Sequence, residues 1–535
     1  MSTGPLRLTS QAHTALRPAD AARVTDGFWA ARRRTNAEVS IPQGPAKLEE
    51  AGNLANLRAA AGGAGSFAGD FQFQDSDVHK WLEAASWQLP ESPGLAASIG
   101  ELVRLLATAQ EPDGYLQTYY QLARPDRRWQ ELGWGHELYC AGHLIQAAVA
   151  HHRTSGRRDL LDVAVRFAEH IDATFGPDKA VDGICGHPEI ETALVELYRE
   201  TGEQRWLELA RYFVEQRGHG LLSGGGDRGH DRDPGPAYWQ DHLPVREATT
   251  VAGHAVRQLY LLAGATDLAT ETHDPELRAA LERVWDAMVA TKTYVTGGVG
   301  ARHEWESFGD PYELPPDRAY TETCAAIASV QWSWRMALLT GEAKYSDLVE
   351  RTLFNGFLSG VGLDGDSWLY VNPLQVREEY ADRGGDQSAR RTPLVPGRHP
   401  HRRPRPDRPA DPPRPPRGRG RGLCGDRARA AGALPGGSGP AARYPLPRAS
   451  VVLSNPGVSA RKVRTAQLGG LRSALQRPPP RQVPLTRSPR SILRLRATPG
   501  DGGPWPTGAC LSCRHTAAGW LGFRHPANTQ PANAH

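Results

Sequence analysis

The sequence predicts a mainly α-helical protein, built as a ring of paired helices (an α/α toroid) and followed by a basic tail. Three observations lead to this prediction: apolar residues recur at helical spacing, a helix-ending turn repeats along the chain, and the composition changes abruptly near residue 391. Alternation of the β type is scarce before residue 365. A chain of 535 residues is long enough to bury a large core.

Helical spacing is clearest in two stretches of the chain. Apolar residues recur at i, i+3, i+4 and i+7 over residues 99–106, and the same spacing is found over residues 160–171. This period predicts amphipathic helices that each bury one stripe of side chains.

A short polar turn links one helical pattern to the next at four places. In each turn a Gly or an Asp-Pro follows a threonine, and the turns begin at Thr154, Thr201, Thr272 and Thr340. Such residues end one helix and cap the next, so the chain forms helical hairpins at intervals of about 50–70 residues. Repeated hairpins indicate a closed toroid or an open α-solenoid. The toroid is favoured because Trp, His and Glu clusters fall between the hairpins, where a central funnel would gather them.

The chain divides into an N-terminal extension (1–20), a helical domain (21–390) and a tail (391–535). The tail holds 26 Lys and Arg against 4 Asp and Glu, and 25 of the 43 prolines, whereas residues 1–390 carry a net charge of −18. A tail so poor in apolar residues is expected to be disordered. It is either a basic linker that binds nucleic acid or acidic surfaces, or the out-of-frame translation of a GC-rich gene. The second interpretation is favoured because the change is abrupt, so nucleic acid is not the partner expected.

Neither a secretory signal nor a membrane span is expected from the sequence. No 7–15-residue apolar run follows Met1, and no stretch of about 18 apolar residues occurs that would span a membrane. The six cysteines are too sparse for a disulfide framework. We therefore expect a cytoplasmic protein with no membrane partner.

The segment from Gly297 to Ala326 carries the densest set of polar residues. It begins with a glycine-rich turn, passes through an acidic loop and enters a helix expected to start at about Ala319. Glu322 and Cys324 flank this helix start, where a carboxylate and a thiolate could bind Zn²⁺. A capping glutamate and a buried structural cysteine are the alternative.

This segment resembles the signature of glycoside hydrolase family 127, with Glu306 and Glu322-Thr-Cys324 at the matching positions. Further stretches agree in order and spacing over roughly residues 20–390. They are Val24–Trp29, Asp75–Trp81, Pro112–Leu116, Gly135–Tyr139, Gly186–Glu191, Gly253–Arg257 and Tyr370–Pro373.

The resemblance implies an (α/α)6 toroid with a C-terminal β-sandwich. It also implies a retaining exo-hydrolase that acts on oligosaccharides ending in β-L-arabinofuranose through a zinc-bound cysteine thiolate. Glu306 would be the general acid/base, and Glu322 and Cys324 would be two of four zinc ligands. The sugar pocket would be lined by His136, His187, His254 and Tyr370. Zinc would supply the lowered thiol pKa that such a nucleophile needs.

Each of these residues also has a structural explanation. His187 and His254 stand at helix starts and could serve as caps, whereas the aromatic residues around His136 could seal a helix end. Tyr370 lies in a strand-like stretch that could belong to the core. Glu306 has a rival two positions earlier in Glu304.

The chain departs from the family pattern after Tyr370. The remaining two zinc ligands, one of them the nucleophile, are an adjacent Cys-Cys pair, and no Cys-Cys occurs in this sequence. We therefore expect an incomplete toroid, a zinc site lacking two ligands and impaired hydrolysis. The alternatives are a non-catalytic carbohydrate-binding toroid and a metal-independent toroid enzyme, such as a sugar epimerase or a uronyl hydrolase.

Overall fold

The computed structural model describes residues 4–19, 24–69, 71–222, 234–375 and 392–393. The predicted tail lies outside these residues apart from Thr392 and Pro393, as do Cys424, Cys510 and Cys513. The described chain is mainly helical, as predicted. Its strands are β1 (Ser367–Trp368) and β2 (Thr392–Pro393), which pair antiparallel with Ser367 opposite Pro393.

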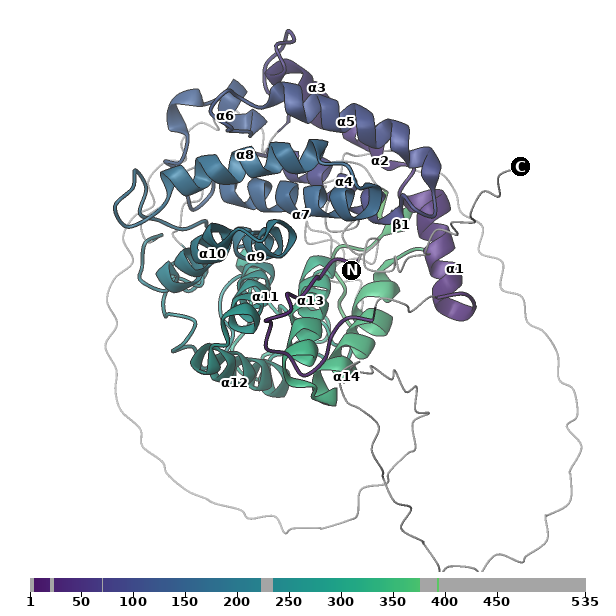
Figure 1. Ribbon diagram of the computed structural model, residues 1–535. Helices are drawn as coiled ribbons and strands as arrows, with labels where there is room; N and C mark the ends of the chain where they lie inside the picture. The colour runs from purple at the N-terminus through teal and green to yellow at the C-terminus, as the bar shows by residue number, and fades with distance from the viewer. Residues whose placement is uncertain (1–3, 20–23, 70, 223–233, 376–391, 394–535) are drawn as a thin grey trace, which may run out of the picture.

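Ten helices of the described chain form five hairpins that follow one another around the molecule (Figure 1). The first helix of each hairpin lines the inside of the ring: α4 (Asp75–Gln88), α7 (Glu137–Ser155), α9 (Ile190–Thr201), α11 (Ala255–Thr272) and α13 (Thr323–Thr340). The second helix covers the outside: α5 (Ala96–Ala109), α8 (Asp159–Thr174), α10 (Gln204–Gln216), α12 (Pro275–Thr291) and α14 (Ala343–Thr352). Shorter helices precede or join them: α1 (Gly27–Thr35), α2 (Gly44–Glu50), α3 (Asn53–Ala60) and α6 (Thr118–Leu122).

The inner helices pack in sequence, α4 on α7, α7 on α9, α9 on α11 and α11 on α13. Extensive packing between α13 and α4, which would close this inner ring, is absent from the described residues. The described chain thus builds five hairpins of a toroid and leaves the ring open at one place.

The predicted helices and turns are confirmed. The apolar stripe of residues 99–106 is buried in α5, and that of residues 160–171 is buried in α8. Each of the four predicted turns separates the two helices of one hairpin. In three of them a glycine (Gly156, Gly202 or Gly341) takes the left-handed conformation that ends the helix, with φ of 74°, 78° and 76°.

The start of α13 differs from the prediction. The helix begins at Thr323 rather than at about Ala319. Glu322 instead forms an antiparallel bridge with Val371, and the Thr323 N–H donates to the Tyr370 carbonyl at 2.9 Å. These pairings hold Glu322 in an extended conformation, with φ of −65° and ψ of 145°, so the helix begins only at Thr323.

The five inner helices run parallel, because each returns to its starting side through an outer helix. His136 and Glu189 directly precede α7 and α9, and His254 and Glu322 are the N-caps of α11 and α13. The N-termini of the inner helices therefore surround one mouth of the ring.

An N-terminal strap, residues 4–17, crosses the opposite end of the ring (Figure 1). The Arg7 N–H and guanidinium donate to Glu196 and Glu200 of α9, at 3.0 and 3.2 Å. Further along, the strap donates backbone bonds to the Thr270 carbonyl of α11 and the Leu338 carbonyl of α13, both at 2.9 Å. The strap thus links the C-terminal ends of three inner helices.

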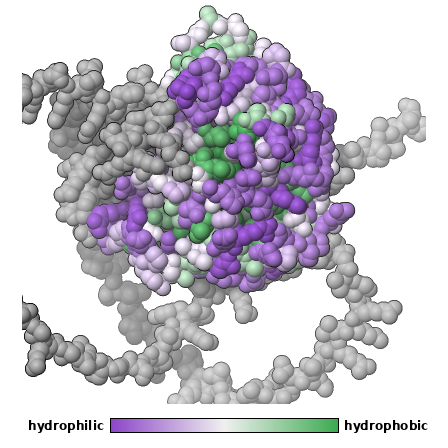
Figure 2. Space-filling view, turned by 90° about the vertical axis from the view of Figure 1, so that its left-hand side faces the viewer, coloured by the Kyte–Doolittle hydropathy of each residue, from purple (hydrophilic) through white to green (hydrophobic). Residues whose placement is uncertain are grey.

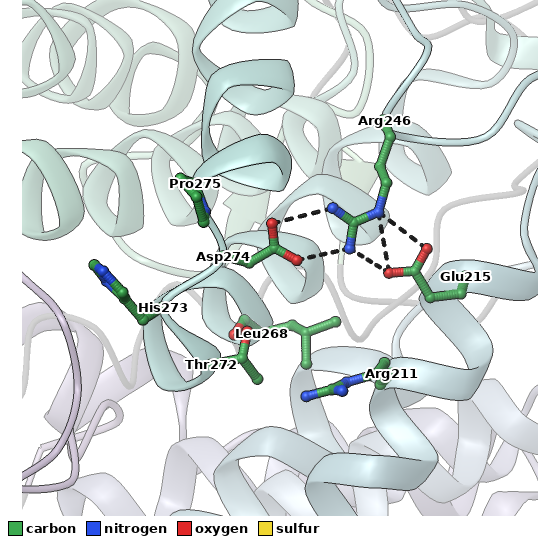
Figure 3. A pocket seen from close by; sticks show the side chains of 8 residues that line it. All are labelled: Arg211, Glu215, Arg246, Leu268, Thr272, His273, Asp274 and Pro275. Atoms are coloured by element: carbon green, nitrogen blue, oxygen red, sulfur yellow. Dashed lines mark hydrogen bonds and ion pairs between the residues drawn. The ribbon is translucent and has the colours of Figure 1, made fainter.

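A hollow of about 580 Å³ lies between α10, α11 and α12 (Figure 3). Within it the Arg246 guanidinium bonds to both Glu215 and Asp274, so its charge is already compensated. The hollow adjoins the C-terminal end of α11, which is roughly 27 Å from the N-terminal end of that 18-residue helix.

The surface seen in Figure 2 is mostly hydrophilic, with an apolar area near its middle. In the described part of the chain, no helix combines the length and apolar character that a membrane crossing would need.

The mouth of the ring is anchored beneath His136 by its neighbour Glu137. The Tyr115 hydroxyl donates to Glu137 at 2.6 Å and the Trp129 N–H donates at 3.0 Å, while only 3% of Glu137 is exposed. Burial raises the pKa of the Glu137 carboxyl from 4.5 to about 8, although these hydrogen bonds oppose the rise.

We predict that Leu6→Ala in the strap lowers the free energy of unfolding by about 2–5 kcal/mol, because it empties a buried site. Leu6 is 1% exposed. Chemical denaturation measures the change, and Gln11→Ala is the matched control because Gln11 is exposed. Equal small effects in both variants would show that the strap does not contribute to the core.

Glu137→Gln should reduce the dependence of stability on pH. The folded carboxyl keeps its proton to about pH 8 and the unfolded one only to about 4.5, so the unfolding free energy of the wild type falls between these values. The neutral variant should lose roughly 1.4 kcal/mol less per pH unit over that range. Denaturation at several pH values tests this, with the exposed Glu208→Gln as control. Parallel curves for wild type and Glu137→Gln would contradict the prediction.

Candidate active site

Three histidines predicted to line a sugar pocket lie in a row across the mouth of the ring. The ring centroids of His136 and His187 are 5.8 Å apart, and those of His187 and His254 are 5.9 Å apart. His136 and His254 are the N-cap residues of α7 and α11, and His187 lies three residues before the start of α9. Tyr139 packs on His187 with a centroid distance of 4.3 Å and supports the middle of this histidine row.

Hydrogen bonds to the backbone assign the tautomers of all three rings. The Nδ1 atom of His187 lies 2.9 Å from the Pro188 carbonyl, and that of His136 bonds to the Trp134 carbonyl. Both rings must therefore carry the hydrogen on Nδ1, which leaves Nε2 as an acceptor. In His254 the Nδ1 atom accepts from the Val256 N–H at 3.2 Å, so Nε2 carries the hydrogen.

The three histidines are kept neutral. Burial lowers the pKa of His136 to about 3, with the Arg257 cation as the next cause. The pKa of His187 is also well below its ordinary value for these two reasons, and burial lowers that of His254. The row therefore offers uncharged donors and acceptors.

Glu306 lies next to the row and is held from two sides. His254 donates from Nε2 to its carboxylate at 2.8 Å, and the Tyr320 hydroxyl donates to the other oxygen at 2.7 Å. Partial burial would raise the pKa of Glu306, but the hydrogen bonds from His254 and Tyr320 outweigh this effect and hold the pKa below its ordinary range. The rival Glu304 is exposed.

Glu322 and Tyr370 meet on the α13 side of the mouth. The Tyr370 hydroxyl donates to Glu322 Oε1 at 3.1 Å, whereas the other carboxylate oxygen is buried without a hydrogen-bond partner. Burial and the neighbouring Glu306 raise the pKa of Glu322 well above its usual value. Glu322 is thus both the N-cap residue of α13 and a side chain with one oxygen left to satisfy.

The zinc ion implied by the resemblance has an incomplete set of donors here. Cys324 is buried in the first turn of α13, two residues beyond Glu322. Among the described ranges, no three His, Cys, Asp or Glu side chains come together as a metal site. Two donors fall short of the four that hold zinc in proteins, so the described residues do not fit the ion by themselves.

Backbone strain gathers at the same place. Four residues without a glycine's freedom have left-handed φ angles near the site: His136 (58°), Trp305 (58°), Glu306 (52°) and Thr321 (36°). Each costs of order 1–3 kcal/mol and persists only where the surroundings impose it. Strain of this kind is typical of positions selected for function.

Two residues that sequence reasoning passed over complete the site. Tyr320 binds Glu306, and Arg257 lies three residues after His254, on the same face of α11. The i, i+3 spacing of Arg257 was a usable signal for a shared face. The partners of Tyr320 depend on extended pairing that no helical pattern reveals.

Two residues of the Asp75–Trp81 stretch make structural contacts. The Asp75 carboxylate accepts two bonds from Thr118, both at 2.6 Å. Trp81 is fully buried, and its indole N–H donates to the Ile41 carbonyl at 2.9 Å. Both side chains thus make contacts that fix the position of α4.

Comparison with known proteins agrees with the resemblance. Residues 21–393 match the family described as Beta-L-arabinofuranosidase, GH127 catalytic domain. A curated relative, the non-reducing end beta-L-arabinofuranosidase of Bifidobacterium longum subsp. longum, is 38% identical over 394 residues, which are 67% of this chain and 60% of the relative.

Solved structures give the same result. The GH127 β-L-arabinofuranosidase Ara127N-Se from Geobacillus stearothermophilus T6 is 40% identical with a TM-score of 0.65, over 68% of this chain and 60% of that one. The GH127 β-arabinofuranosidase BT3674 is 38% identical with a TM-score of 0.63, over 69% and 58%. This chain thus spans about 60% of the length of these relatives. The family match and the relatives together confirm the predicted resemblance: the chain belongs to the GH127 family of glycoside hydrolases.

Proposed function

We propose that the mouth of the ring binds a terminal β-L-arabinofuranosyl group, as in a retaining exo-β-L-arabinofuranosidase, and that hydrolysis by this chain is impaired. The observation that carries the proposal is the position of Glu306. It is a partly exposed carboxylate, 38% accessible, bound by His254 and Tyr320 at the end of a row of neutral histidines. The arabinofuranosyl group is proposed because the relatives are named as arabinofuranosidases.

The chemistry of the row suits a sugar. The Nε2 acceptors of His136 and His187 can each take a hydrogen bond from a hydroxyl group, and neutral rings do so without a counter-ion. Burial strengthens these bonds because water competes less for the same atoms.

Glu306 is the proposed general acid/base. In the free protein its carboxylate is ionised, which is the form that takes a proton from a water or hydroxyl group. To act as the acid it must first gain a proton, and a bound sugar that excludes water would favour this by raising the carboxyl pKa.

Hydrolysis is expected to be impaired because the set of zinc-binding residues is incomplete. Glu322 and Cys324 are the residues that would hold zinc, which would supply a stabilised thiolate as nucleophile. The sequence has no Cys-Cys pair to complete the set. We therefore propose a binding-competent pocket with very weak or no turnover.

A metal-independent toroid enzyme remains the second candidate, because the described residues form no complete metal site. Turnover of an epimerase or unsaturated uronyl substrate that survives Cys324→Ser would favour it.

Glu306→Gln should weaken the binding of L-arabinose by about tenfold, because it replaces a charged hydrogen-bond acceptor. Isothermal titration measures this, with Glu304→Gln as the matched control two residues away. Release from an aryl β-L-arabinofuranoside should stay at background for all three proteins. Turnover typical of a glycosidase would contradict the impairment, and equal affinities in both variants would contradict the role of Glu306.

Zinc content provides a separate check. The purified chain should retain far less than one zinc per molecule after dialysis, and Cys324→Ser should not change this value, because two ligands bind the ion weakly. Atomic emission measures the metal. One tightly held zinc per chain that is lost in Cys324→Ser would show that a complete site exists.

A further inference from the structure

We propose that Arg257 is a positioning residue that fixes the three histidine-bearing segments of the pocket relative to one another. The contacts of Arg257 are all with protein groups, but its importance for sugar binding rests on the proposed function. Arg257 is 4% exposed and lies in the first turn of α11.

Arg257 reaches all three segments of the row. Its own helix carries His254, three residues earlier on the same face. Its Nη1 donates to the Gly186 carbonyl at 2.9 Å, directly before His187. Its guanidinium lies 5.8 Å from the ring centroid of Trp134, whose carbonyl binds His136.

These segments have little freedom to adjust. A Cβ atom on Gly186 would lie 1.9 Å from the Gly133 carbonyl oxygen, and one on Gly253 would lie 2.0 Å from the Ala237 carbonyl oxygen. The loops before His187 and His254 are therefore packed backbone against backbone. Arg257 bonds to the Gly186 loop and lies over the Trp134 ring in the loop before His136, so this one side chain can set the distance between the two loops.

A purely structural arginine looks different in this protein. Arg217 is also fully buried, but it pairs with Glu191 at 3.4 Å in addition to two carbonyl bonds. Among the described residues, no carboxylate lies within 4 Å of the Arg257 guanidinium, and its Nε has no hydrogen-bond partner. Contact with the faces of Tyr238 and Trp239, each at 4.8 Å, offsets part of the cost of burying this charge.

The Arg257 cation, which has no carboxylate partner in the described part of the chain, acts on the pocket. Arg257 contributes to the lowered pKa of His136, His187 and His254, and it also favours the ionised form of Glu306. Other charged groups facing the row are Lys80, which acts on His136, and Glu306 itself, which acts in the opposite direction on His254. A fixed cation behind the row thus keeps the rings neutral as well as aligned.

The test compares Arg257→Gln, which removes the charge, with Arg257→Lys, which keeps it but loses the planar fork. NMR titration of the imidazole signals measures the pKa values of the three histidines, with His187→Asn used for assignment. Titration with L-arabinose measures the affinity, which depends on the geometry of the row. Arg205→Gln is the control, because that arginine stacks on Trp206 at 4.1 Å but is 39% exposed and far from any of these contacts in the sequence.

We expect Arg257→Gln to raise the pKa of the row by about one unit or more. Arg257→Lys should keep the low values yet bind L-arabinose about tenfold more weakly. Unchanged histidine pKa values and affinity in a folded Arg257→Gln protein would overturn the proposal. If Arg257→Gln does not fold, wild-type affinity in Arg257→Lys would overturn it. If the wild type binds no L-arabinose but Arg257→Gln still changes the histidine pKa values, the positioning role of Arg257 would stand and the sugar pocket would be rejected.

Discussion

The parallel course of the inner helices is the constraint on which the rest of the structure depends. Each hairpin returns the chain to the same side of the ring, so the N-termini of the inner helices surround one mouth. Residues far apart in the sequence, such as His136, His254 and Glu322, become neighbours for this reason alone. The helix ends also present unpaired N–H groups and a partial positive charge, which favour an ionised carboxylate and disfavour protonated histidine.

At the opposite end of the ring, the C-terminal ends of the helices require hydrogen-bond donors and cations. These ends present carbonyl groups and acidic side chains. In the strap, the Arg7 guanidinium donates to Glu200, and backbone N–H groups donate to the Thr270 and Leu338 carbonyls. Arg199 adds a fully buried cation that contacts Glu196, Asp267 and Glu271. This network of buried ion pairs thus holds the end that carries no candidate chemistry, whereas the mouth retains weakly compensated groups such as Arg257 and Glu322.

The sequence was sufficient to predict the hairpins because their signals are local. A threonine followed by glycine, as at Gly202 and Gly341, ends a helix through its own backbone preference, whatever the helix packs against. The motif positions of His187, His254 and Glu306 were likewise read from the chain, and the structure brings them together. The start of α13 could not be read, because it depends on pairing with residues near Tyr370, some 50 positions away. Tyr320 was missed for the same physical reason, because its role exists only once the loops of different hairpins meet. The spacing of Arg257 from His254 was visible in the chain, but its contacts with Gly186 and Trp134 were not.

The central claim is that the histidine row, Glu306 and Arg257 form one sugar-binding site at the mouth of the ring. Imidazole NMR during a titration with L-arabinose tests this most directly. We predict that the signals of His136, His187 and His254 shift together and give a single dissociation constant. Signals that stay unchanged, or that report separate constants at the three positions, would contradict it.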